Sequence, residues 1–494
     1  MEPDELEIQP HDDVYLKIDC EKGMAKELSD FFTFKVPNYQ YTPAYKNKVW
    51  DGKIRLFNYH RHTIYSGLYD YIIQFAKDRN YKIKSKKFSR KENKIPNNKV
   101  IDFLDVRLNI PFQPYEHQVE AITKCINKNR CLLLSPTGSG KSLIIYALVR
   151  YYCDILPKNK KMLIIVPTTG LVAQMYNDFQ DYSKNNDWDV EEKCHKIYSG
   201  QDKDNDKKVF VSTWQSLYKM PAEYFKQFGA VFGDEAHLFK SKSLTSIMTK
   251  LVDCPYRIGT TGTLDGSMTH KLVLEGLFGK VYQPTSTKKL MEKELLSTLS
   301  IDCVTLKYTM KEIQENKRVR YHDEIKWLIN SNKRNEFIVD LAHKIKGNTL
   351  ILFNFVQEHG IPLFEKIKKR CKNKKVFLIH GKTEVEQRED IRNILEKEKN
   401  AILVASYGTC STGINIRNIN NIIFASPSRS VIRVLQSIGR GLRKTENKSK
   451  VKLYDISDDL RYKKYVNHTY RHLEERMRIY ENEQFDFNQI VIQT

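Results

Sequence analysis

The 494-residue sequence predicts an α/β protein in which two parallel-sheet domains follow a small N-terminal α/β (α+β) domain. The chain is too long for one ordinary domain. After Pro111, short apolar runs typical of buried parallel strands alternate with helical segments. The same pattern starts again after about residue 300. We therefore expect domains at residues 1–108, 109–295 and 296–494.

The N-terminal part mixes short β-like runs with amphipathic ones. The runs "VYLKID" and "KIRLFNY" favour strands, and "AKELSDFF" and "LYDYIIQFAKD" favour helices. The polar stretch "KSKKFSRKENKIPNNK" that follows predicts a linker or an exposed loop.

Ten apolar runs define the two sheets. We expect the first sheet to contain "CLLLS", "MLIIVP", "KVFVS", "AVFGD" and "YRIGTT". We expect the second to contain "TLILFN", "VFLIHG", "AILVAS", "NIIFAS" and "VKLYDI". The tail from Arg461 is polar and is expected to be helical.

Composition limits the class of protein. No apolar run reaches the ~18 residues that span a bilayer, and the acidic start "MEPDELEIQP" is not a signal peptide. We expect a soluble protein of the cell interior with no membrane partner. Nine cysteines without a CxxC pair argue against a structural zinc site and a disulfide framework.

The charge balance favours a polyanionic partner. Lys and Arg number 82 against 60 Asp and Glu, so the net charge is +22. Such a field concentrates nucleic acid. The alternative is a lysine-rich composition of no functional meaning, because Asn, Ile and Tyr are also abundant. Charge alone leaves both interpretations open.

The segment "SPTGSGKS", residues 135–142, predicts a phosphate-binding loop. It matches GxxxxGK[ST] except that Ser135 replaces the first glycine, and it lies between a strand-like and a helix-like run. The two glycines allow backbone N–H groups to face phosphate oxygens. Lys141 would neutralise the β- and γ-phosphates, and the Ser142 hydroxyl would bind Mg²⁺. The expected ATP-binding residues of the loop are Thr137, Gly138, Ser139, Gly140, Lys141 and Ser142.

A phosphate loop requires a carboxylate at the end of another strand, and "AVFGDEAHLF" supplies one. Asp234 follows the apolar run and would hold Mg²⁺, and Glu235 would polarise the attacking water. The alternative is a helix N-terminus with two acids that favour the helix dipole.

The ordered motifs between residues 114 and 443 resemble those of superfamily 2 helicases and translocases, which carry two RecA-like lobes. "PYEHQVEA" resembles the adenine motif, in which Gln118 would read the base edge. "GTTGT" resembles the motif whose threonines, Thr261 and Thr263, would link the ATP site to the nucleic-acid track.

The resemblance also implies a nucleic-acid track and a second half of the ATP site. "VPTTGLVAQ" and "VSTWQSL" resemble the track motifs of the first lobe, and "IHGK" resembles one of the second. The track residues would be Pro167, Thr168, Gln174, Thr213, His380 and Gly381. "VASYGTCSTGINI" and "QSIGRGLR" resemble motifs V and VI. They would add Gly413, Asn415 and Gln436 to the ATP site, with Arg440 and Arg443 as catalytic groups on the γ-phosphoryl oxygens.

More narrowly, the whole chain resembles phage recombination helicases, through "KVWDGKIRLF", "TWQSLYKMPAEYFKQFG", "STKKLMEKELL", "VASYGTCSTGINIRN" and "LQSIGRGLRK". This implies a DNA-binding, ATP- and Mg²⁺-dependent enzyme with 3′→5′ polarity in the cytoplasm of a host cell. Its substrates would be forks, Holliday junctions, D-loops and R-loops, the last containing an RNA–DNA hybrid. Asn415 stands where many members of the superfamily have Asp, which puts a ribose contact there in doubt.

Aromatic and basic residues interleave in "NYQYTPAYKNKVWDGKIRLF". Rings suit bases and cations suit phosphates, so Trp50 and Lys53 are candidates for nucleic-acid binding. The alternative is a small module with an aromatic core and a solvated basic face.

Three other classes of protein stay open. A non-unwinding double-stranded DNA translocase would use the same two lobes. A binding protein with an inactive ATPase is disfavoured, because every catalytic group that the motifs require is present. An RNA helicase is compatible with motifs that grip mainly the backbone.

Overall fold

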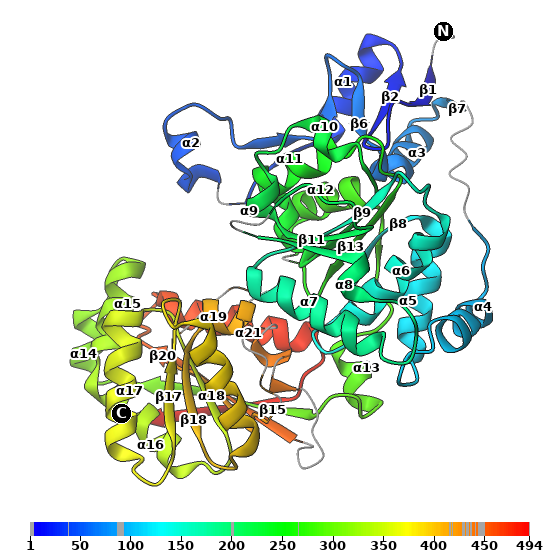
Figure 1. Cartoon of the computed structure of the whole chain (residues 1–494). Helices are drawn as coiled ribbons and strands as arrows, with labels where there is room; N and C mark the ends of the chain where they lie inside the picture. Colours follow the sequence, from blue (N-terminus) through cyan, green and yellow to red (C-terminus); the bar gives the residue numbers. More distant parts are fainter. Residues whose placement is uncertain are drawn as a thin grey trace. The chain divides into compact units, whose positions relative to one another are not determined.

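The computed structural model describes residues 4–37, 39–85, 93–198, 202–264, 266–413, 416, 418–426, 430, 434, 437–439, 441–442 and 450–493. They form two compact units (Figure 1). Unit 1 comprises residues 1–135 and 140–284, and unit 2 comprises residues 285–494 together with 136–139 of the phosphate loop. The expected three-part division at residues 108 and 295 stays a prediction.

Unit 1 begins with a five-stranded sheet in the order β5-β6-β2-β1-β7. Leu6 and Ile8 on β1 are buried and alternate with more exposed glutamates, so one face of the sheet is packed. Only the β1–β7 pair is parallel among the described pairs of this sheet, which makes the N-terminal part α+β. The elements are β1 (Glu5–Pro10), β2 (Tyr15–Asp19), α1 (Lys22–Phe31), β5 (Phe57–Asn58), β6 (Thr63–Tyr65), η2 (Ser66–Leu68), α3 (Tyr69–Asp78) and β7 (Lys82–Ser85).

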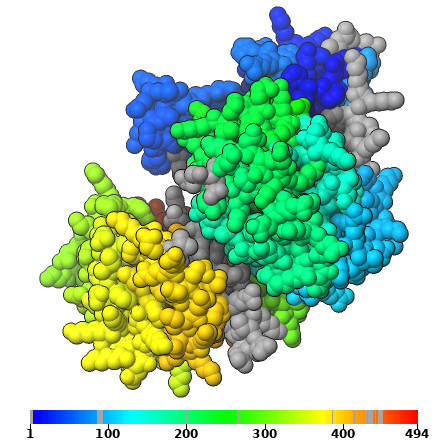
Figure 2. Space-filling view, in the orientation of Figure 1, coloured from blue at the N-terminus to red at the C-terminus, as the bar shows by residue number. Residues whose placement is uncertain are grey.

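An arm leaves this sheet and stands out from the surface of unit 1 (Figures 1 and 2). Its stem is the antiparallel pair β3 (Thr33–Lys35) and β4 (Lys53–Arg55). Its end carries η1 (Tyr39–Tyr41) and α2 (Pro43–Lys46). The Thr42 side chain caps α2, and a proline occupies its first turn.

The rest of unit 1 is a seven-stranded sheet in the order β10-β11-β9-β12-β13-β8-β14, and every described strand pair in it is parallel. All five strands expected here are present, and the short edge strands β10 and β14 were not expected. The strands are β8 (Arg130–Leu134), β9 (Lys161–Val166), β10 (Cys194–Ile197), β11 (Val209–Thr213), β12 (Phe228–Asp234), β13 (Tyr256–Thr261) and β14 (Val281–Tyr282).

Helices cover both faces of this sheet, as right-handed crossovers between parallel strands require. They are α4 (Asn97–Asp102), η3 (Phe103–Arg107), α5 (Glu116–Lys128), α6 (Lys141–Ile155), α7 (Thr169–Tyr182), α8 (Val190–Lys193), α9 (Trp214–Leu217), α10 (Ala222–Phe225), η4 (Ala236–Lys240), α11 (Lys242–Lys250) and α12 (Met268–Phe278).

The N-terminal sheet and the first lobe share one hydrophobic core. Side chains of both parts belong to a single buried cluster that includes Phe75 and Phe278. The contact is also polar: Tyr71 donates to the buried Glu275 carboxylate at 2.6 Å, and Arg130 donates to Ser66 at 2.6 Å. Removing the N-terminal part would therefore expose apolar surface of the first lobe.

Unit 2 contains a second seven-stranded sheet in the order β17-β18-β16-β19-β20-β15-β21, again with every described pair parallel. The five expected strands are present, and β15 and β21 were not expected. The strands are β15 (Thr298–Lys307), β16 (Thr349–Phe353), β17 (Val376–Ile379), β18 (Ile402–Ser406), β19 (Asn421–Phe424), β20 (Lys450–Asp459) and β21 (Phe487–Gln493).

The polar tail is helical only in part. It forms α21 and then the edge strand β21, so the expectation of a helical tail was wrong for its last residues. The described helices of unit 2 are α13 (Thr287–Glu292), α14 (Met310–Glu315), α15 (Tyr321–Asn330), α16 (Asn332–Lys344), η5 (Val356–Gly360), α17 (Ile361–Arg370), α18 (Val385–Lys397), α19 (Tyr407–Gly413) and α21 (His468–Asn482). Among the described residues of the chain, no helix is long and apolar enough to cross a membrane.

Two fully buried ion pairs fasten helices to β20. Arg334 on α16 donates to both oxygens of Asp458 at 3.0 and 3.1 Å, and Tyr308 donates to the same carboxylate at 2.7 Å. Arg476 on α21 donates to both oxygens of Asp455 at 3.0 and 2.8 Å. Breaking one partner of such a pair leaves an uncompensated buried charge.

Arg334→Ala should therefore destabilise the protein by about 3–5 kcal/mol, because Asp458 would remain buried without its cation. The matched control is Arg392→Ala, which breaks the exposed Arg392–Glu389 pair and should cost about 0–1 kcal/mol. Thermal and urea unfolding followed by circular dichroism measure the difference. Equal losses for the two variants would contradict this account of the buried pair.

Candidate active site and nucleic-acid interface

The phosphate loop connects β8 to α6 with the backbone geometry that its glycines allow. Gly138 and Gly140 have φ of +88° and +82°, in the left-handed region that side chains disfavour. Lys141 Nζ donates to the Ser135 carbonyl at 3.3 Å. Ser135 itself continues the strand, because its N–H donates to the Thr261 carbonyl at 2.8 Å. A serine at this position is thus compatible with the loop.

Gln118 lies against this loop. Its side-chain carbonyl accepts from the Tyr115 N–H at 2.9 Å, which caps α5. Its Nε2 faces Gly140 so closely that a Cβ atom at that glycine would collide with it. The structure therefore brings the expected adenine-reading residue next to the phosphate loop. Its role as an adenine ligand stays a prediction.

Asp234 and Glu235 follow the carboxyl end of β12. Asp234 is half-buried and accepts a hydrogen bond from Thr260 at 2.8 Å. Burial raises the pKa of Asp234, and the neighbouring Glu235 carboxylate adds to the rise, while Lys141 opposes it. Glu235 has φ of +50°, an uncommon conformation for a residue with a side chain. Such strain is concentrated at functional sites.

A buried histidine connects this acidic pair to the next strand. His237 Nδ1 lies 3.3 Å from Glu235 Oε2 and 3.0 Å from Thr261 Oγ1. Thr261 in turn donates to the Thr263 carbonyl at 3.0 Å. A continuous polar path thus runs from Glu235 to the "GTTGT" segment, where the sequence predicted a link.

The Ser142 hydroxyl lies 2.8 Å from the Tyr182 hydroxyl at the end of α7. Phe112 packs edge-on against the same tyrosine, with 5.7 Å between ring centroids. No local pattern in the sequence predicts Tyr182, because it is 40 residues from Ser142 and the two meet only where α6 packs on α7.

A cavity of about 540 Å³ opens where β9 and β11 end side by side. It contains three of the four track residues expected in the first lobe, and Gln174 is exposed on α7 outside its lining. Tyr198, Lys203 and Gln215 were not expected, and they add a ring, a cation and an amide. The full lining is Pro167, Thr168, Thr169, Tyr198, Lys203, Thr213, Gln215 and Ser216.

In unit 2, His380 and Gly381 form the loop that leaves the carboxyl end of β17. The backbone carbonyls of both accept from Arg388, at 3.4 and 3.1 Å, which fixes the loop. Gly413 is the last residue of α19, directly downstream of β18. Four expected ATP-site residues lie outside the described residues: Asn415, Gln436, Arg440 and Arg443.

The two N-terminal candidates are less exposed than their neighbours on the arm. Trp50 is half-buried, and its indole N–H donates to the Lys53 carbonyl at 2.9 Å. It therefore stabilises the turn before β4. Tyr41 and Val49 are 70% and 81% exposed, so among the described residues of the arm Tyr41 has the most accessible ring, ahead of Tyr45 at 37%.

Three family models match the chain. The model described as "Type III restriction enzyme, res subunit" matches residues 111–266, and "Helicase conserved C-terminal domain" matches residues 333–445. "DNA helicase UvsW, N-terminal" matches residues 5–85. With two parallel-sheet lobes and their ordered motifs, these matches define a superfamily 2 helicase, an ATP-dependent enzyme that binds nucleic acid.

The chain is 34% identical over 508 residues to the ATP-dependent DNA helicase uvsW of Enterobacteria phage T4, a match that covers 98% of each chain. It therefore belongs to the uvsW helicase family. The crystal structure of T4 UvsW matches 99% of both chains with a TM-score of 0.51 and 32% identity. The predictions of family and of two RecA-like lobes behind an N-terminal α+β domain are confirmed.

More distant relatives share the motor. The DNA 3′-5′ translocase XPB2 of Sulfurisphaera tokodaii is 24% identical, over 75% of this chain and 87% of its own. The DNA-bound Type ISP restriction-modification enzyme LlaBIII matches 78% of this chain and 32% of its own, with a TM-score of 0.57 and 15% identity. The latter likeness shows the fold alone.

Gly140→Ala should weaken nucleotide binding about tenfold or more. A left-handed backbone costs a residue with a side chain about 1–2 kcal/mol, and the new Cβ would push Gln118 Nε2 away. The control is Gly23→Ala, at an exposed position where a Cβ meets no atom within 4 Å. Titration with a fluorescent ATP analogue measures the change. Equal affinity in the two variants would contradict the tight fit at Gly140.

Proposed function

We propose that this helicase uses ATP hydrolysis to remodel branched DNA, such as forks, Holliday junctions, D-loops and R-loops, in phage recombination, repair and replication. The observation that carries the proposal is the match to a phage T4 DNA helicase along 98% of the chain, including the N-terminal part. The likeness to a phage helicase supports action in the cytoplasm of an infected host cell, and the likeness to a DNA 3′-5′ translocase supports 3′→5′ polarity.

In the proposed mechanism, Lys141 and the N–H groups of the phosphate loop bind the β- and γ-phosphates. Glu235 orients and polarises the attacking water, with His237 within 3.3 Å to hold its carboxylate. Gln118, beside Gly140, is positioned to read the adenine edge. Arg440 and Arg443 would stabilise charge on the γ-phosphoryl group.

The residues also fit a Mg²⁺ ion. Asp234 is a half-buried carboxylate whose pKa is raised by desolvation and by the neighbouring Glu235, so a divalent cation would relieve the cost of its negative charge. Ser142 supplies a neutral oxygen at the junction of β8 and α6, two strands from β12 in the sheet. When bound, Mg²⁺ would neutralise negative charge on the phosphates during transfer. The Ser142 hydroxyl also lies 2.8 Å from the Tyr182 hydroxyl.

The cavity of Pro167, Thr168 and Thr213 is the proposed nucleic-acid contact of the first lobe. Lys203 would pair with a phosphate, and Tyr198 offers a ring to a base or sugar. His380 and Gly381 are the proposed contact of the second lobe. Residues 1–108 would be an accessory DNA-binding module in which the arm carries the exposed aromatic and basic groups.

Two alternatives remain distinguishable by experiment. A non-unwinding double-stranded DNA translocase would hydrolyse ATP on plain duplex and displace no strand. An RNA helicase would prefer RNA substrates. A strand-displacement assay on a fork, a four-way junction, a plain duplex and an RNA–DNA hybrid separates these functions. Unwinding of none of the four substrates would contradict the proposal.

Lys141→Ala and Glu235→Gln should each lower kcat for ATP hydrolysis by at least about 10²-fold, because one removes the phosphate cation and the other the group that polarises water. DNA affinity should change less than about twofold, since neither residue lines the cavity of the track. The control is Glu223→Gln, an acid of the same lobe whose side chain is 77% exposed. Steady-state ATPase and fluorescence anisotropy give the two readouts, and near wild-type turnover would refute the assignment.

The double variant Tyr41→Ala/Lys46→Gln should weaken binding to forked DNA about tenfold, through loss of one stacking ring and one phosphate contact. Point variants suit this test better than truncation, which would open the core shared with the first lobe. The control is Tyr59→Ala/Lys22→Gln, which removes one exposed tyrosine and one exposed lysine elsewhere in the N-terminal part. A loss of equal size in the control would exclude a specific role for the arm.

A further inference from the structure

Unit 2 carries a strongly basic pocket that none of the motor motifs uses. Its volume is about 690 Å³. Four cationic side chains and two tyrosines form it, and none of the described lining residues is acidic. Collecting like charges in one hollow is unfavourable unless an anion compensates them. The lining residues are Lys317, Arg318, Tyr462, Lys463, Lys464 and Tyr465.

The backbone holds two of these cations at the end of a tight turn. Tyr462 and Tyr465 exchange both backbone hydrogen bonds, at 3.0 and 2.9 Å. Lys463 and Lys464 are the two residues between them, and Lys463 has φ of +52°. A two-residue turn of this kind requires the left-handed conformation at its first position. Both lysines therefore project from a fixed frame.

The Tyr462 ring brings a third cation close. The Nζ atoms of Lys317 and Lys463 each lie 5.5 Å from the centroid of this ring. Each contact is worth roughly 0.5–1 kcal/mol at an exposed site, which offsets part of the repulsion between the two charges.

Nearby carboxylates are already engaged. Asp459 pairs with Arg461 at 2.8 Å. Glu324 is fully buried and accepts from Asn467 and from the N–H of Thr469, at 3.1 and 2.7 Å. Because these two acids serve the fold, they do not neutralise the four cations of the pocket, and the described lining offers no carboxylate of its own.

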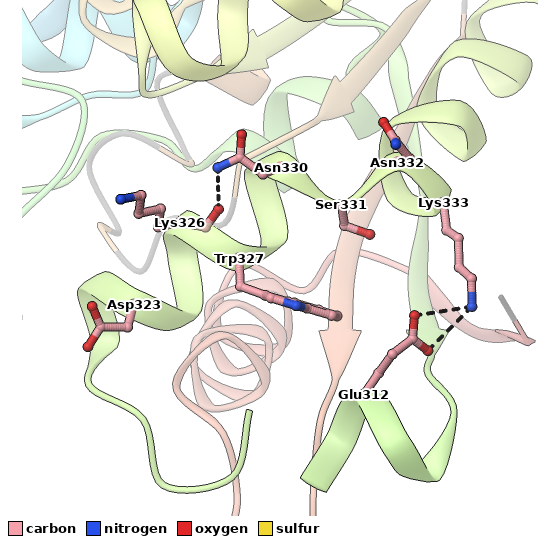
Figure 3. A pocket seen from close by; sticks show the side chains of 8 residues that line it. All are labelled: Glu312, Asp323, Lys326, Trp327, Asn330, Ser331, Asn332 and Lys333. Carbon is pink, nitrogen blue, oxygen red and sulfur yellow. Dashed lines mark hydrogen bonds and ion pairs between the residues drawn. The ribbon is translucent and has the colours of Figure 1, made fainter. Parts of the chain in front are cut away.

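Another hollow in unit 2 shows the contrast (Figure 3). It is lined by two acids, Glu312 and Asp323, and two lysines. Lys333 lies 3.1 Å from Glu312, and the close-up shows this pair facing each other across the hollow. That pocket is balanced in charge. The basic character of the pocket at Tyr462 is therefore local and not a general property of this surface.

The location of the basic pocket suggests its ligand. Its two segments leave the carboxyl ends of β15 and β20, and the His380 loop leaves the carboxyl end of β17. Because the sheet is parallel, these ends lie on one edge. β20 is four strands from β17, which is roughly 19 Å at ~4.8 Å per strand. One strand of B-form DNA presents about six phosphates over that length.

We infer that this pocket binds the sugar–phosphate backbone of DNA and extends the contact of the second lobe beyond the His380 loop. The inference rests on the proposed function, because it assumes that the same edge of the sheet faces DNA. The lysines and Arg318 pair with phosphates, and the two tyrosines pack against sugars or bases.

The test compares Lys317→Gln/Lys464→Gln with the control Lys326→Gln/Lys372→Gln. Both variants remove two exposed lysine charges from unit 2. Lys326 lines the pocket of Glu312 and Asp323, in which acids and lysines are equal in number. Lys372 precedes the amino end of β17, whereas the basic pocket lies beyond the carboxyl ends of the strands. Fluorescence anisotropy with forked DNA at several salt concentrations gives the affinity and its salt dependence, and ATPase at saturating DNA gives kcat.

The pocket variant should bind about five- to twentyfold more weakly, and the slope of log K against log salt should flatten by about 1.5, because two phosphate contacts are lost. The control should change neither quantity by as much, and kcat should stay at the wild-type value in both. Lys464→Gln alone, at the exposed tip of the turn, should give about half the change in slope. Equal slopes in the pocket variant and the control would overturn the inference.

Different results would refute the motor function and the DNA-binding role of the basic pocket. Absence of DNA-stimulated ATP hydrolysis in the wild-type protein would refute the proposed motor function, whatever the pocket does. Normal stimulation in the wild type, with a pocket variant that binds like the control, would refute only the pocket.

Discussion

Parallel pairing of strands is the constraint on which the rest of the structure depends. In both seven-stranded sheets every described pair is parallel, so the segments that leave the carboxyl ends of the strands emerge at one edge. Parallel pairing places residues as distant in sequence as Ser135, Pro167, Thr213 and Asp234 at the same end of the sheet. Burial of the apolar residues of each strand fixes how neighbouring strands pair. The polar residues that follow these strands then lie together and can form a binding site. The same rule places the His380 loop and the basic pocket on one edge of the second lobe.

The charged side chains at the carboxyl ends of these strands contact polar partners from neighbouring strands and loops. Asp234 accepts a hydrogen bond from Thr260, and desolvation together with the neighbouring Glu235 carboxylate raises the pKa of its carboxyl. Lys141 opposes that rise, and Glu235 adopts a strained backbone beside His237. A cation and the phosphates of a nucleotide would therefore bind favourably at this site. The charged side chains are already in position, so little reorganisation of the protein is needed on binding.

The sequence predicted the interior of the fold better than its margins. Central strands such as β9 and β12 are continuous apolar runs, and all ten that were expected are present. The edge strands β10, β14 and β21 are short or polar, and they are strands because a neighbour offers hydrogen bonds. The exception is β15, an interior strand between β20 and β21 that was also not expected. The same limit applies to the site. Lys141 and Asp234 lie in motifs with fixed spacing, whereas Tyr182, Lys203 and Tyr198 reach the site through helix packing and loop paths that no local pattern records.

In the second lobe, the buried ion pairs of β20 lie next in sequence to the turn that carries the exposed lysines Lys463 and Lys464. Asp455 and Asp458 on β20 are each satisfied by an arginine from a helix, and these pairs fix α16 and α21 against the sheet. Glu324 then caps the start of α21, next to the turn that carries Lys463 and Lys464. Asp455, Asp458 and Glu324 thus have structural roles, because each one contacts a group that fixes a helix. The cations at the turn have no carboxylate partner in the described lining, so a phosphate from a bound nucleic acid would complement their charge.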